Sequence, residues 1–150
     1  MSIIEDNSQH VMFHFENDKK MDLNGIKTYL NYWALKQQKK EVFTGTVDTS
    51  AVKDIDFIVG IKNAITIGKF VKKMKKQPIQ YLNYTILVIG NNTLIGLLDM
   101  IFKITKPCAS VYVVETTAIA DQLYEVLERK NDLEINAYLV INEITYVKPT

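Results

Sequence analysis

The sequence predicts an α/β fold: a single domain with a mostly parallel or mixed sheet of about five strands and three to four helices packed on it. The stretch Tyr84–Glu115 supports this most directly, since it reads as an apolar strand, an Asn-rich turn, an amphipathic helix and a second apolar strand. Such a βαβ unit builds parallel sheets with helices on them. Both strands are almost continuously apolar, which indicates a sheet covered on both faces.

Composition narrows the classes of function. A chain of 150 residues with 47% hydrophobic and 23% charged residues is typical of one globular domain. The net charge of +1 gives no overall attraction to nucleic acid or to an anionic membrane. Arg129 is the only arginine, and arginine is the usual residue for bidentate recognition of phosphate or guanine. We therefore expect no nucleic-acid partner.

The single cysteine and the absence of targeting signals bear on location. Cys108 cannot form an intramolecular disulfide, which suits a reducing compartment. The N-terminal residues lack a basic region followed by an apolar core, and no apolar run approaches the roughly 20 residues of a membrane span. These features predict a cytoplasmic protein.

The N-terminal part is predicted to contain a loose leader at residues 1–9 and a strand at Val11–Phe15. His10 and His14 are four residues apart, which on a strand is a distance of about 13 Å, too far for one metal ion. We interpret them as two surface or edge histidines and expect no metal site.

A helix is predicted from Asp22, its N-cap, to Lys39, with Trp33 on the apolar face that packs on the sheet. Tyr29, Tyr32 and Trp33 occupy adjacent positions around this helix, so at least one of them is expected to face away from the sheet. An exposed aromatic side chain beside a C-terminal edge strand would favour a homodimer.

Polar residues that follow two of the strands are the candidate ligand-binding residues, because open α/β sheets place ligands at the carboxyl ends of their strands. They are Asp48, Thr49 and Ser50 after the strand at Val42–Val47, and Asn91, Asn92 and Thr93 after the strand at Tyr84. The second turn has one glycine and no Lys-Ser/Thr pair, so it does not match a phosphate loop. Asn92 or Thr93 is more simply the cap of the next helix.

Residues for catalysis are sparse. Cys108 precedes an apolar strand and is predicted to be a small buried hydrophobe, and both histidines lie in a different element. Asp54 and Asp56 stand near a helix start, where acidic side chains are expected for structural reasons. We therefore expect no catalytic residue, no enzyme activity and no cofactor.

A second long helix is predicted from Asp56 to Lys76. Gly60 and Gly68 each weaken it by roughly 1 kcal/mol relative to Ala, so close packing against a neighbour is the expected reason for them. Its later part carries a basic patch formed by Lys69, Lys72, Lys73, Lys75 and Lys76. The patch is either a solvated helix face or a site for phosphate or lipid headgroups.

The C-terminal part is predicted to form a helix from Ala118 to about Lys130, capped by Thr116 and Thr117. Residues 135–150 contain two strand-like pieces, AYLVI and EITYV, and are predicted to form an edge strand or hairpin and a tail.

The order of elements over about residues 22–130 resembles the STAS domain, the anti-sigma-factor-antagonist fold. The motifs that carry the resemblance are GTVDTSAVKDIDFIVG, YTILVIGNN and SVYVVET. The same plan occurs in CRAL-TRIO lipid-transfer domains, where a strand delivering Asp-x-Ser precedes a long helix, as Asp48–Ser50 does here. STAS regulators carry a phosphorylatable Ser at the start of the long helix. Asp56–Gly60 has apolar residues in place of the serines, which departs from that pattern and leaves phosphorylation open.

The resemblance implies, as a first hypothesis, a non-enzymatic regulatory or protein–protein interaction module of STAS-like architecture with a protein partner. The alternative is a domain related to CRAL-TRIO that binds a lipid or a small apolar ligand, with a lipid or membrane surface as partner. The second alternative is a small enzyme with its site at the sheet's C-terminal edge.

Overall fold

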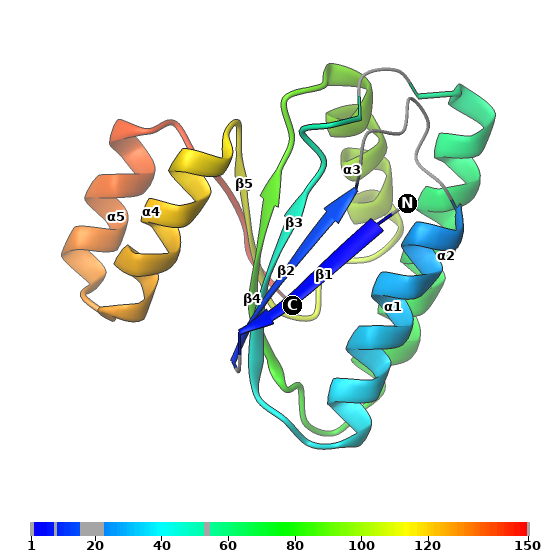
Figure 1. Cartoon of the computed structure of the whole chain (residues 1–150), viewed down its shortest axis with the longest axis horizontal. Helices are drawn as coiled ribbons and strands as arrows, with labels where there is room; N and C mark the ends of the chain where they lie inside the picture. Colours follow the sequence, from blue (N-terminus) through cyan, green and yellow to red (C-terminus); the bar gives the residue numbers. More distant parts are fainter. Residues whose placement is uncertain (1, 8, 16–22, 53–54, 150) are drawn as a thin grey trace.

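A six-stranded sheet divides the molecule into two helical layers (Figure 1). The structure is a computed structural model that describes residues 2–7, 9–15, 23–52 and 55–149. The strands are β1 (Ser2–Asn7), β2 (His10–Phe15), β3 (Phe43–Asp48), β4 (Leu82–Val88), β5 (Ser110–Val114) and β6 (Thr145–Val147). The helices are α1 (Leu23–Gln38), α2 (Phe57–Lys75), α3 (Asn92–Ile104), α4 (Thr117–Glu128) and α5 (Asp132–Ile141). The predicted α/β class with a mixed sheet is confirmed.

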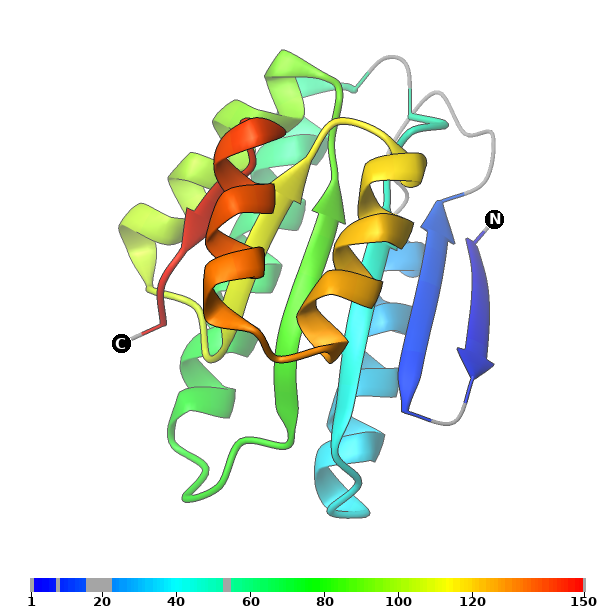
Figure 2. The same ribbon diagram turned by 90° about the vertical axis from the view of Figure 1, so that its left-hand side faces the viewer.

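The strands lie in sequence order across the sheet, from β1 to β6. β2, β3, β4 and β5 are parallel to one another, whereas β1 and β6 run antiparallel to them at the two edges. Three right-handed crossovers that all advance in one direction place α1, α2 and α3 on the same face. The last connection, through α4 and α5, ends in an antiparallel strand and covers the other face (Figures 1 and 2).

Of two predictions about the chain's ends, the N-terminal one is wrong and the C-terminal one is confirmed only for its edge strand. Residues 1–9 contain β1, which forms a hairpin with β2 in which Asn7 pairs with His10. Its charged sequence was misleading, because an edge strand needs backbone pairing rather than an apolar face. The AYLVI piece lies in α5 rather than in a strand. Only the EITYV piece contains a strand, β6 at the sheet edge.

α5 is a helix because of its cap and its packing. The side chain of Asn131 accepts a hydrogen bond from the backbone N–H of Glu134 at 3.1 Å, which starts the first turn. Ile135, Tyr138 and Leu139 follow at helical spacing and pack into the cluster beneath α4. This packing outweighs the strand propensity of the Val and Ile residues.

The ends of the other helices agree closely with the sequence. Asp56 caps α2 and Thr116 caps α4, as predicted. α3 is capped by Asn91 rather than by Asn92 or Thr93, because the Asn91 side chain accepts hydrogen bonds from the first turn. The predicted cap of α1, Asp22, lies outside the described residues.

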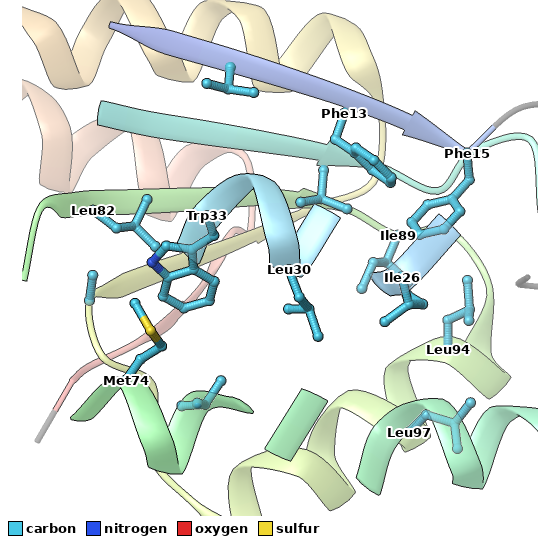
Figure 3. Close-up of a cluster of buried hydrophobic side chains, with 14 of the residues drawn as sticks. Phe13, Phe15, Ile26, Leu30, Trp33, Met74, Leu82, Ile89, Leu94 and Leu97 are labelled. Carbon is cyan, nitrogen blue, oxygen red and sulfur yellow. The ribbon is translucent and has the colours of Figure 1, made fainter. Parts of the chain in front are cut away.

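Successive side chains of each strand point to opposite faces of the sheet and so contact different helical layers. Val11, Phe13 and Phe15 of β2 belong to the core cluster beneath α1, α2 and α3, together with Trp33 of α1 (Figure 3). β4 interrupts the alternation, since the three residues Phe43–Gly45 of β3 lie opposite the four residues Leu82–Thr85 of β4. The extra residue is a β-bulge that turns Leu82 onto the same face as Thr85.

Candidate functional site

The predicted ligand residues lie at one edge of the sheet, but most of their polar groups have structural roles. Thr49 ties the end of β3 to β4, since its backbone N–H and its hydroxyl donate to the carbonyl of Val88 at 3.1 and 2.7 Å. The Asn91 carboxamide accepts from the N–H groups of Thr93 and Leu94. Asn92 and Thr93 are exposed first residues of α3. These contacts describe a turn and a helix cap, not a phosphate cradle.

Asp48 has a partner that sequence reasoning missed. His14 lies at the end of β2, and its Nδ1 is 3.0 Å from Oδ2 of Asp48 on the neighbouring strand β3. The other carboxylate oxygen of Asp48 accepts from the backbone N–H of Ser50 at 2.9 Å. Both residues lie at or next to the ends of parallel strands, which is the feature of the sequence that could have indicated their proximity. Their pairing, however, depends on the strand register between residues 34 positions apart.

The pKa of Asp48 lies below its usual value. Burial acts to raise it, but hydrogen bonds from Ser50 and from His14 together outweigh burial and stabilise the carboxylate. An ionised Asp48 is therefore part of the folded state at neutral pH. The pair joins β2 to β3 at the edge where the candidate residues lie.

His10 is buried, which corrects its interpretation as a surface or edge histidine. Its Nδ1 is 2.7 Å from the Thr44 hydroxyl and its Nε2 is 3.1 Å from the Thr46 hydroxyl, so both ring nitrogens have partners on β3. The ring stacks on Tyr124 of α4 with 4.0 Å between centroids. Burial lowers the pKa of His10, although Glu128 and Asp121 act in the opposite direction. In its neutral form, His10 therefore contacts both β3 and Tyr124 and so connects α4 to the sheet.

A cavity of about 160 Å³ lies between the sheet and helices α1, α2 and α3. Its walls are almost entirely apolar and include Leu30 of α1, Ala64 of α2, Leu97 of α3 and Leu87 of β4. Gly60 shows how closely α2 and α3 approach beside it, because a Cβ on Gly60 would lie 2.6 Å from Leu97 Cδ1. The predicted close packing at this glycine is confirmed.

The polar groups of the cavity wall are few, and most are engaged. Tyr29 shares a hydrogen bond with Thr85, and burial raises the pKa of Tyr29 to about 12. The thiol of Cys108 donates to the carbonyl of Val71 at 3.6 Å, and burial raises its pKa to about 11, so it is not a ready nucleophile. Trp33 differs, since it is 6% exposed and its indole Nε1 has no hydrogen-bond partner among the described residues.

The aromatic residues of α1 do not form the surface that the sequence suggested for a dimer. Tyr29, Tyr32 and Trp33 all contact the same apolar cluster. α1 also lies toward the β1–β2 side of the sheet, whereas β6 forms the opposite edge (Figure 2). The predicted basic patch lies on α2, where Lys69, Lys72, Lys73 and Lys76 are exposed and Lys75 is half-buried against Thr105.

Among the described residues there is no group of three or more His, Cys, Asp or Glu side chains placed to hold a metal ion. No helix in the same part of the chain is both long and apolar enough to cross a membrane. Comparison with family models, with curated proteins and with solved structures finds no match for this chain. Of the candidate sites, the apolar cavity is the one enclosed by side chains from several elements, α1, α2, α3 and the sheet.

Proposed function

We propose that the protein binds a small, largely apolar molecule in the cavity between the sheet and α1–α3. The cavity itself carries this proposal. Its volume of about 160 Å³ is similar to that of an engineered protein cavity of roughly 150 Å³ that binds benzene.

The indole N–H of Trp33 favours a ligand that also carries a hydrogen-bond acceptor. A buried N–H without an acceptor is unfavourable, so a ligand that carries one hydrogen-bond acceptor fits this wall better than a pure hydrocarbon. In Figure 3 the indole nitrogen lies on the side of the ring toward Leu82, which is itself part of the cavity wall. The expected ligand is a compact ring or short chain with a carbonyl or ether oxygen.

Cyclohexanone and methylcyclohexane test both properties, because they have similar shapes and only the ketone has an acceptor. Ligands that bind the folded state raise its melting temperature. Trp33 is the only tryptophan, so its indole N–H gives one NMR signal. We expect both compounds to raise the melting temperature, the ketone at lower concentration, and only the ketone to shift that signal downfield. In Trp33→Phe the preference for the ketone should disappear.

Ala64→Leu is the matched test of the site, because it fills the cavity from α2. This variant should no longer bind either compound, whereas Ala118→Leu on the exposed side of α4 should bind both as the unmodified protein does. A melting temperature that stays constant with every compound tested, in a protein that also carries no co-purified small molecule by native mass spectrometry, would refute the proposal.

A second candidate function is self-association, which is one form of the interaction module that the sequence suggested. α5 has an apolar, uncharged outer face that includes Leu133, Ala137, Val140 and Ile141, and Val140 is 78% exposed. It lies next to β6, whose outer edge ends the sheet (Figure 2). Antiparallel pairing of β6 with β6 of a second copy has two-fold symmetry and would bring two such faces onto the same side of the joined sheet.

The occupant of this surface is a second copy because the apolar face and the free edge of β6 are contiguous, and Leu133, Ala137, Val140 and Ile141 would be removed from water against the same side chains of an identical face. Sedimentation velocity should therefore show a concentration-dependent dimer. Val140→Asp should shift it to monomer, while Ala118→Asp, the same kind of change on exposed α4, should not. A monomer at all concentrations would exclude this function without affecting the cavity proposal.

A further inference from the structure

The outer face of α2 is a continuous stripe of exposed lysine and isoleucine side chains. Its members recur every three or four residues along one face of the helix. They are Ile58, Lys62, Ile65, Lys69, Lys72 and Lys76, all exposed, with Phe57 exposed at the start of the helix. Phe57 and Ile58 are 67% and 64% exposed, which is unusual for large apolar side chains. The segment 57–76 contains no acidic residue.

The fold separates the charges of a chain that is almost neutral overall. Segment 57–106, with α2 and α3, has a net charge of +7, from Lys62, Lys69, Lys72, Lys73, Lys75, Lys76, Lys103 and Lys106 against Asp99. Segment 115–144, with α4 and α5, has a net charge of −5, from Glu115, Asp121, Glu125, Glu128, Asp132, Glu134 and Glu143 against Arg129 and Lys130. These two segments place their helices on opposite faces of the sheet (Figure 1). The net charge of +1 therefore conceals a strongly basic surface.

We propose that this face of α2 docks on an anionic phospholipid membrane. The lysines supply attraction to lipid phosphates and carboxylates, and the exposed Phe57, Ile58 and Ile65 supply side chains that enter the boundary between headgroups and acyl chains. The acidic helices α4 and α5 then face away from the membrane. Neither the positive charge nor the apolar side chains would suffice alone for membrane binding, and α2 carries both along one helix.

Nucleic acid fits this surface less well. Phosphate backbones are contacted chiefly by Arg and Lys with polar neighbours, and this face has no arginine but two large apolar side chains, Ile58 and Ile65, with Phe57 exposed at its start. The inner side of the same helix contributes Ala64, Ile67 and Val71 to the cavity wall. Docking through the outer side would therefore bring the cavity close to the lipid phase, although the docking inference stands without any ligand.

Vesicle flotation tests the inference on the full chain. We expect binding to phosphatidylcholine vesicles that contain phosphatidylserine, little binding to phosphatidylcholine alone, and loss of binding as salt is raised. Each lysine near an anionic surface contributes about a fivefold change in affinity. Lys69→Gln, Lys72→Gln and Lys76→Gln combined should therefore weaken binding about a hundredfold.

The matched control removes three exposed lysines elsewhere: Lys27→Gln, Lys39→Gln and Lys148→Gln. It has the same net charge as the α2 variant, so it should still bind within a few-fold if the α2 face is the docking surface. Ile58→Ser with Ile65→Ser should weaken binding and make the remainder more sensitive to salt. Equal loss in the two lysine variants, or no preference for phosphatidylserine, would overturn the inference. So would binding to duplex DNA without binding to vesicles.

Discussion

The two faces of the sheet share the same strands but are stabilised differently. The face beneath α1–α3 is apolar and incompletely filled, and its outer helix surface is basic. Beneath α4, the side chains of Ile86 and Leu123 have no exposed area. This face also uses polar contacts, since His10 lies between two threonine hydroxyls and Tyr124. The two faces therefore differ in kind: one borders a cavity, and the other combines apolar packing with a buried histidine.

Truncation of one leucine on each face gives the largest expected effect. Leu123→Ala on α4 should lower the free energy of unfolding by about 4 kcal/mol, because a fully packed site leaves a new cavity. Leu30→Ala on α1 should cost only about 2–3 kcal/mol, because this side chain already borders a cavity and loses fewer contacts. Urea denaturation measures both, and equal losses would show that the faces are packed alike.

Substitution of Asp48, at the carboxyl ends of the parallel strands, should give the next largest change in stability. Asp48→Asn should destabilise the protein by about 1–2 kcal/mol at pH 7, since it weakens hydrogen bonds from Ser50 and His14 to a charged group. The pKa of Asp48 is lowered in the folded state, so its contribution is present above the usual carboxyl pKa and is lost as pH falls through the folded value. The variant and the unmodified protein should therefore converge in acid. If the two proteins still differ in the free energy of unfolding in acid, the shape of the side chain rather than its charge causes the destabilisation.

Alanine substitutions of the glycines in α2 test whether the α1–α3 face has room for an added methyl group. Gly68→Ala should raise the free energy of unfolding by about 0.5–1 kcal/mol, because the new Cβ meets Ile104 at an ordinary 3.6 Å. Gly60→Ala requires Leu97 Cδ1 to move, and the adjacent cavity gives it room. Its effect should stay within about 1 kcal/mol of zero and should weaken ligand binding. A loss well above that would mean that Leu97 cannot move.

The smallest effect is a pH dependence confined to the α4 face. The pKa of His10 is lowered from 6.5 in the folded state, so the unfolded chain takes up a proton first as pH falls below 6.5. Stability should decline over the window between 6.5 and the folded pKa. His10→Phe keeps a ring against Tyr124 but cannot titrate, so its stability should change less between pH 7 and about pH 5. A parallel decline in the two proteins would show that another group controls this range.

Much of the fold could be predicted from local pattern, and most of the site could not. Strands β3, β4 and β5 and helices α2 and α4 follow from apolar runs, caps and periodicity. The AYLVI piece resembles a strand because of its Val and Ile residues, but the Asn131 cap and the packing of α5 on α4 make it a helix. Local propensity carries no information about that contact.

The site depends on long-range geometry. The His14–Asp48 pair needs the β2–β3 register, and the orientation of Leu82 needs the bulge in β4. A cavity is still less visible, because it is the space that side chains leave unfilled, and no residue type encodes it. The sequence predicts the basic patch at Lys69–Lys76, but the stripe that Lys69, Lys72 and Lys76 form with Ile58, Lys62 and Ile65 depends on their exposure in the fold, as does its separation from the acidic helices.

The separation of charge across the sheet also makes the molecule a large electric dipole. In water of low ionic strength, the basic face of one molecule attracts the acidic face of the next over a Debye length of about 30 Å at 0.01 M salt. This contact joins two different faces, so it does not close on itself as a two-fold dimer does and instead extends into chains. We therefore expect solutions to turn cloudy on dialysis into dilute buffer and to clear when salt is added, well away from the isoelectric point.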